Sequence, residues 1–131
     1  MMTKQQHITY WISSSEHDLL AMDSLFTSGH YAWSLFIGHL VIEKILKARW
    51  LLDHDEPVPP KTHSLDKLAK ETGLQLDEST MTWLVQANDF NLETRYPDYR
   101  MEFYKKATRE FAETNISRIK DIFQCVRKTM P

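Results

Sequence analysis

The chain has 131 residues and carries 16 Lys and Arg against 18 Asp and Glu, a formal net charge of −2 at pH 7. Apolar residues make up 42% of the sequence and charged residues 26%, with only 3 Gly and 5 Pro. This composition excludes a disordered or low-complexity chain and predicts a single helical domain over residues 1–131. The lone cysteine, Cys125, excludes an internal disulfide and a thiolate metal cluster, and it favours a cytoplasmic location.

The charges are distributed unevenly along the chain. Residues 1–94 hold 7 basic and 13 acidic groups, a net charge of −6, whereas residues 95–131 hold 9 basic and 5 acidic groups, a net charge of +4. The C-terminal segment could therefore face an anionic partner. Its basic residues are interspersed with acidic ones, which is equally typical of a solvated helix face.

Apolar residues recur at helical spacing through the first half of the chain. Steps of three and four residues predict a helix from about Lys4 to Ser28, ended by a left-handed Gly29. A second helix, from about His30 to Asp53, is apolar around most of its circumference, which is typical of the central helix of a bundle. We expect no secretory signal, and the uncharged stretch Ser24–Ile42 is too polar to predict a membrane span.

The second half of the chain begins with a proline-containing loop, residues 54–62. The pattern then predicts a short helix from about His63 to Thr72, capped by Thr62, and another from about Glu78 to Phe90. A last long helix is predicted from about Tyr99 to Lys128. Since no strand pattern or internal repeat is present, the sequence predicts an all-α fold, an antiparallel up-and-down bundle of four to five helices.

Six histidines raise the question of a metal centre. No two of them lie three or four residues apart, and none belongs to an HExxH motif, so we expect no metal site. Three scattered glycines cannot form a phosphate-binding loop, and no serine or cysteine has a visible base beside it. We therefore expect neither a bound cofactor nor a nucleophilic catalytic site.

A polar stripe interrupts the second predicted helix. His39, Glu43 and Lys47 follow one another at steps of four residues, so they share one helix face. One interpretation is a solvated seam in which Glu43 and Lys47 form an ordinary surface pair. The other is that Glu43 meets an arginine of another element, or of a second subunit, in a half-buried groove.

The segment 94–100 supplies candidates for such an arginine. It places Arg95 and Tyr96 ahead of Asp98, at the start of a predicted helix. Guanidinium groups bind phosphate, tyrosine rings stack on bases, and helix N-termini attract anions. The alternative is that Arg95 forms a surface ion pair and that Asp98 caps the helix.

Four sequence elements in this order resemble the HEPN domain family, and the resemblance extends over nearly the whole chain. The elements are Asp18-Leu19-Leu20-Ala21-Met22 followed by Gly29-His30-Tyr31, then Glu43-Lys44-x-x-Lys47-Ala48, then Thr62-His63-x-Leu65, and finally Arg95-Tyr96-Pro97-Asp98. The resemblance implies an up-and-down helical bundle that commonly dimerises, in agreement with the helix pattern. We therefore expect a homodimer.

One branch of the family implies a metal-independent ribonuclease. Its active site is an Arg followed four to six residues later by a His, paired across a dimer. This sequence departs from that pattern, because no histidine follows His63 and the positions after Arg95 hold Arg100, Met101 and Glu102. In related toxins a Tyr two places after that His is modified by a partner nucleotidyltransferase, and Tyr104 occupies the corresponding position as a candidate modification site.

The other branch resembles this chain better. It consists of small free-standing HEPN proteins that act beside a minimal nucleotidyltransferase, as toxin–antitoxin-like pairs. The resemblance implies a non-catalytic module that binds nucleotide or RNA. Two other interpretations stay open, a ribonuclease with a degenerate Arg-His site and a purely structural assembly protein. The residues expected to bind nucleotide or RNA are Arg95, Tyr96, Asp98, Glu43, Lys44 and Lys47.

Overall fold

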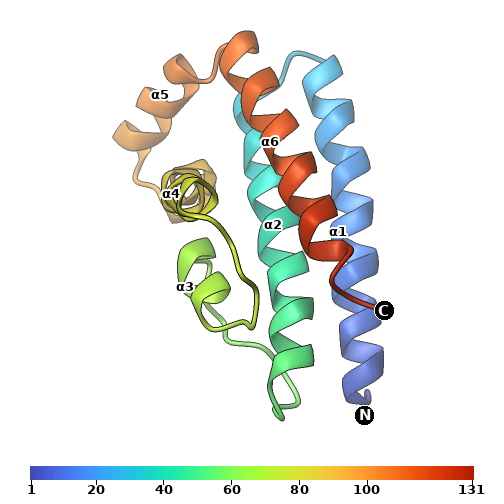
Figure 1. The fold of residues 1–131 in the computed structure, drawn as a ribbon. Coiled ribbons are helices and arrows are strands. Elements are labelled where there is room, and N and C mark those ends of the chain that lie inside the picture. Colours follow the sequence, from blue (N-terminus) through green and yellow to red (C-terminus); the bar gives the residue numbers. More distant parts are fainter.

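The computed structural model describes all 131 residues as an all-α fold, which confirms the predicted helical bundle (Figure 1). Its three long helices are α1 (Lys4–Thr27), α2 (Tyr31–Asp53) and α6 (Arg109–Arg127). Helix α2 packs against both of the others. It runs antiparallel to α1, and α6 runs in the same general direction as α2, so the chain ends beside the N-terminal half of α1 (Figure 1). No helix combines the length and the apolarity that crossing a membrane requires.

The first two helices are bounded as the sequence predicts. Thr3 and Gln6 form a capping box at the start of α1, each side chain bonding the backbone N–H of the other residue. Gly29 has φ 82°, the left-handed conformation that ends a helix without a side-chain clash. This turn reverses the chain direction and lays α2 along α1.

Helix α2 is the centre of the bundle. Fifteen of its 23 residues are buried, as the all-round apolar pattern predicts. Gly38 lies where α1, α2 and α6 meet, because a Cβ atom there would clash with Ile119 Cδ1 of α6 and lie 3.1 Å from Met22 Sδ of α1. The absence of a side chain at residue 38 therefore lets the three long helices approach closely.

Shorter elements cover the side of α2 away from α1 (Figure 1). They are α3 (Leu65–Lys70), α4 (Glu78–Ala87) and two 3₁₀ turns, η1 (Asn88–Phe90) and η2 (Leu92–Thr94). The predicted cap of the first short helix was wrong, because α3 starts after Ser64 and Thr62 Oγ1 instead accepts a hydrogen bond from the Ser64 N–H. Asp77 caps α4 through the Thr80 N–H.

The predicted long last helix was wrong, since the chain breaks it into α5 (Pro97–Lys106) and α6. Ala107 leaves helical geometry at ψ 69°, and the Thr108 hydroxyl then accepts a hydrogen bond from the Phe111 N–H to start α6. The bend lets the rings of Phe103 and Phe111 both pack on Phe90, at centroid distances of 5.7 and 6.1 Å. The bundle therefore has six α-helices, and the additional one is α5.

Candidate functional site

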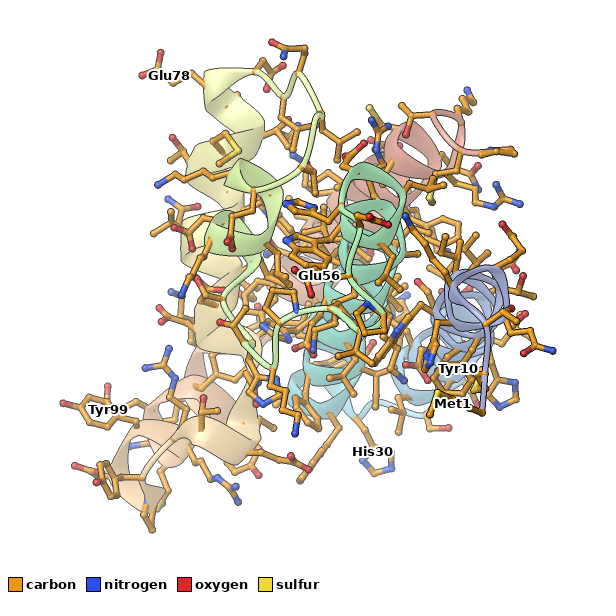
Figure 2. All side chains as sticks on the ribbon, turned by 90° about the horizontal axis from the view of Figure 1, so that it is seen from below. Met1, Tyr10, His30, Glu56, Glu78 and Tyr99 are labelled. Carbon is orange, nitrogen blue, oxygen red and sulfur yellow. The ribbon has the colours of Figure 1, made fainter.

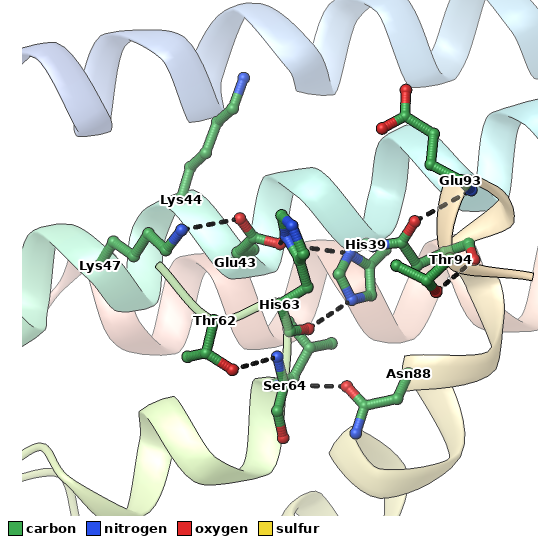
Figure 3. A network of polar contacts seen from close by, with 12 residues as sticks. His39, Glu43, Lys44, Lys47, Thr62, His63, Ser64, Asn88, Glu93 and Thr94 are labelled. Atoms are coloured by element: carbon green, nitrogen blue, oxygen red, sulfur yellow. Dashed lines mark hydrogen bonds and ion pairs between the residues drawn. The ribbon is translucent and has the colours of Figure 1, made fainter. Parts of the chain in front are cut away.

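A buried carboxylate organises the polar stripe of α2 (Figure 3). The Glu43 side chain is only 6% exposed. Its Oε2 atom lies 3.0 Å from Lys47 Nζ, and its Oε1 atom lies 2.9 Å from Nδ1 of His63, on the segment that follows the proline loop. Glu43 thus meets a lysine and a histidine within this chain, and no arginine. The Glu43–Lys47 pair is buried, so the solvated-seam interpretation does not hold.

His39 anchors the same network from one turn earlier on α2. Its Nε2 donates a hydrogen bond to the His63 carbonyl at 3.0 Å, so the neutral ring keeps its hydrogen on Nε2. Nδ1 lies 3.7 Å from Glu43 Oε1 and has no hydrogen-bond partner. Burial lowers the pKa of His39 to about 4, although the Glu43 charge opposes that shift. His39 is therefore neutral at pH 7 and serves to hold the backbone of His63.

His63 is held differently and faces outward. A carboxylate can only accept, so His63 Nδ1 carries the hydrogen that bonds Glu43. The side chain is 56% exposed, and no hydrogen bond engages its Nε2 atom. A carboxylate that fixes one ring nitrogen orients the imidazole and leaves the other nitrogen available to a ligand or to a proton.

A groove of about 420 Å³ opens beside this histidine. Trp11 of α1 and the buried Lys47 lie along it, and the Lys47 amine is 5.4 Å from the centroid of the Trp11 ring. Pro59 and Pro60 belong to its lining, and none of the residues that line it is acidic. Its other cationic or titratable side chains are His7, Lys61 and His63.

The six residues that the sequence analysis selected for binding lie in three places. Glu43 and Lys47 lie together in the network just described. Lys44 points the other way, toward α1, where its amine bonds Asp18 at 2.7 Å and Ser14 at 2.9 Å (Figure 3). Lys44 therefore joins α1 to α2 within this chain and does not line the groove.

Arg95, Tyr96 and Asp98 lie at the start of α5, and the structure does not bring them to Glu43. Arg95 forms an ion pair with Asp89, and Tyr96 and Asp98 are exposed. Tyr96 rather than Asp98 occupies the N-cap position, with Pro97 in the first turn of α5. Tyr104 is 42% exposed on the same helix. Only Phe103 of α5 is buried, and Figure 2 shows Tyr99 pointing away from the rest of the protein.

Sequence reasoning missed four residues of the groove, His7, Trp11, Lys61 and His63. His63 entered the sequence argument only through the Thr62-His63-x-Leu65 element, because nothing in its spacing links it to a carboxylate 20 residues earlier. The sequence did contain one signal for this contact, because the Thr62-His63-x-Leu65 element and the polar stripe of α2 occur together in the same chain. No group of three or more His, Cys, Asp or Glu side chains is arranged to hold a metal ion.

The fold and the sequence of this chain were compared with those of known proteins. The crystal structure of TT1696 from Thermus thermophilus superposes with a TM-score of 0.79, covering 94% of this chain and 98% of that one, at 21% sequence identity. At that identity the likeness establishes the fold alone. No curated protein matches the sequence. The HEPN domain model matches residues 8–129, nearly the whole chain and a range that contains the four sequence elements, so the chain belongs to the HEPN domain family.

Proposed function

We propose that this HEPN domain is a non-catalytic module that binds a nucleotide or the phosphate of an RNA. The observation that carries the proposal is the groove beside α2, which Lys47, Lys61, His63 and His7 line, while Glu43, the carboxylate that bonds Lys47 and His63, lies outside the lining. Ammonium and imidazolium groups bind phosphate through charge-assisted hydrogen bonds. A groove of about 420 Å³ falls within the size range of small-molecule sites.

Trp11 supports a ligand that carries a ring as well as a phosphate. Its indole lies along the groove beside the Lys47 amine. A base that enters the groove would have an aromatic face to stack on, and such stacking tolerates any base. The combination of one aromatic wall with several cations therefore favours a nucleotide over inorganic phosphate alone.

The surface around α5 is the second part of the proposal. Arg95, Tyr96 and Asp98 would serve as a separate contact region for nucleic acid or for a protein partner. Exposed tyrosine, methionine and arginine side chains are characteristic of protein interfaces. The start of α5 carries Tyr96 at its N-cap and Tyr99 and Met101 within the helix, at 75%, 59% and 61% exposure. The family resemblance favours a minimal nucleotidyltransferase as that partner, a toxin–antitoxin-like pairing, Tyr104 as its modification site, and a homodimer.

A metal-independent ribonuclease is the second candidate, and one observation favours it. Glu43 holds His63 with a free Nε2 atom, and His7 lines the same groove, so one imidazole is available as base and another as acid. Incubating a mixed RNA pool with the protein in chelator tests this candidate. Cleavage that His63→Gln abolishes would establish it in place of the binding module.

The binding proposal is tested by calorimetry with mononucleotides. Lys61 is exposed, so Lys61→Ala keeps the fold and removes one groove cation, while Lys67→Ala removes another exposed cation that lies outside the groove. We expect saturable binding by the natural sequence, about tenfold weaker binding by Lys61→Ala, and no change in Lys67→Ala. Absence of saturable binding, or an equal loss in both variants, would overturn the proposal.

A further inference from the structure

We infer that the groove selects a terminal phosphate monoester over the internal phosphodiesters of a nucleic-acid chain, and that His63 is the residue that makes this distinction. The inference rests on the proposed function and deepens it by naming the chemical class of the ligand. A free mononucleotide and a 5′-phosphorylated RNA end share this chemistry.

Buried charge at the base of the groove is already balanced. Glu43 and Lys47 are 6% and 7% exposed and lie 3.0 Å apart, so their charges cancel locally. The Lys47 ammonium has three N–H donors, of which Glu43 Oε2 takes one. Lys47 therefore has donors left for a ligand oxygen, but the net charge that attracts an anion must come from other residues.

That remaining charge comes from the outer residues of the groove. Lys61 contributes one full positive charge, which matches the single negative charge of a phosphodiester. A terminal monoester carries up to two negative charges near neutral pH. The second negative charge is matched only when an imidazole of the groove takes up a proton. A protonated histidine therefore raises the affinity for a monoester, whereas a diester has no second charge for it to match.

His63 is the imidazole placed to take up that proton. Its Nδ1–H is bonded to Glu43 at 2.9 Å, so Nε2 is the ring nitrogen left to take up a proton. The charged or titratable groups around it are Glu43, Lys47 and His39 of α2, Lys61 of its own segment and His7 of α1. Glu43 is the one acidic group among them, and a bound dianion would place further negative charge beside the ring. Binding of a dianion and uptake of a proton are therefore coupled.

Calorimetry at pH 7.5 with four ligands tests the inference. The ligands are AMP, 3′,5′-cyclic AMP, an RNA octamer with a 5′-phosphate and the same octamer with a 5′-hydroxyl, each titrated in two buffers of different ionisation enthalpy. We expect AMP to bind about tenfold more tightly than cyclic AMP and to take up protons on binding. Tighter binding of the phosphorylated octamer than of the hydroxyl octamer identifies the RNA end as a source of the ligand. Preference for AMP without that difference identifies the free nucleotide.

Variants separate His63 from the other groups. His63→Gln is expected to bind AMP no more tightly than cyclic AMP and to lose the proton uptake, while His17→Gln, at an exposed position of α1 outside the groove, behaves like the natural sequence. Lys61→Ala keeps His63, so it is expected to bind both AMP and cyclic AMP more weakly and to keep the preference for AMP. Should His63→Gln fail to fold, the side-chain ¹⁵N resonances of His63 in the natural sequence provide the test, because they report whether Nε2 gains a proton when AMP binds.

Three outcomes contradict the inference. Equal affinity of AMP and cyclic AMP for the natural sequence overturns it while leaving the proposed function intact. Undiminished preference for AMP in His63→Gln, or a His63 ring that gains no proton when AMP binds, overturns the role of His63. If none of the four ligands binds, the proposed function itself fails.

Discussion

The Glu43 carboxylate and the His63 ring, 20 residues apart in the chain, are joined by a hydrogen bond of 2.9 Å between Oε1 and Nδ1. The same carboxylate bonds the buried Lys47 amine at 3.0 Å. The Glu43 carboxylate, in the central helix, thus positions both the Lys47 amine and the His63 imidazole at the edge of the groove. The stability of the bundle and the chemistry of the groove consequently depend on the same residue.

Replacing Glu43 by Gln should destabilise the fold strongly. The change leaves the Lys47 ammonium buried without its counter-charge, which costs about 3 kcal/mol in free energy of unfolding. Lys47→Met should cost less, because Glu43 keeps its bond to the half-exposed His63. The double variant Glu43→Gln/Lys47→Met has no uncompensated buried charge. It should therefore regain more than half of the free energy of unfolding that Glu43→Gln alone loses. Urea unfolding of the four proteins measures this coupling, and strictly additive losses would contradict it.

His39 should make stability depend on pH in mildly acid solution. Burial lowers the pKa of its folded form to about 4, whereas an unfolded histidine titrates near 6.5, so between these values the unfolded chain binds more protons. Stability is therefore greatest above pH 6.5 and falls as the pH drops toward 4, by about 3 kcal/mol from this residue. His39→Gln should show a flatter decline than the natural sequence in denaturant unfolding at pH 7.0 and 4.5. An identical decline in both proteins would refute this role.

Gly38 should tolerate no side chain. A Cβ atom there would clash with Ile119 Cδ1 and lie 3.1 Å from Met22 Sδ, so Gly38→Ala should lower the free energy of unfolding by about 2 kcal/mol through overpacking. Ile119→Val removes the Cδ1 atom, and the double variant should therefore lose less than the sum of the single changes. Gly73→Ala is the control, because its nearest contacts would lie at 3.4 Å. An equal loss at both glycines, or additive losses with Ile119→Val, would exclude the close approach of the helices.

Thr108 should matter for the break between α5 and α6. Its hydroxyl caps α6 by accepting the Phe111 N–H at 3.2 Å, so Thr108→Ala should cost about 1 kcal/mol. Thr114→Ala, at an exposed position inside α6, should be neutral or slightly stabilising because alanine favours helix interiors. Thermal unfolding compares the two variants. If Thr108→Ala unfolds at the same temperature as the natural sequence, the bend depends on the packing of the rings around Phe90 and not on the cap.

The sequence predicted most of the fold because the long helices combine regular apolar spacing with a clear terminator at Gly29. The break after Lys106 was missed because Phe103, Ala107 and Phe111 are spaced as on a continuous helix face. The packing of Phe103 and Phe111 on Phe90, which accompanies the bend, is a contact between separate elements. Periodicity records which residues face inward, but it does not record a change of helix direction that keeps them inward.

The candidate site was predictable only where its residues share one helix. Steps of four residues predicted the stripe that contains Glu43 and Lys47, and the structure joins them. Lys44 is adjacent in sequence but bonds Asp18 of α1, because neighbouring positions on a helix point in different directions. Contacts between separate elements, such as that of His63 with Glu43, follow from tertiary packing and have no local signature. The binding roles of Arg95, Tyr96 and Asp98 stay predictions.

The four tryptophans provide the most direct test of where a nucleotide binds. Trp11 is the one that lines the groove, so titration with AMP should shift the indole N–H resonance of Trp11 together with the backbone amides of Lys61 and His63. The indole resonances of Trp33, Trp50 and Trp83 should stay in place. Shifts confined to the segment around Arg95 and Tyr96, with Trp11 unmoved, would contradict a binding site in the groove.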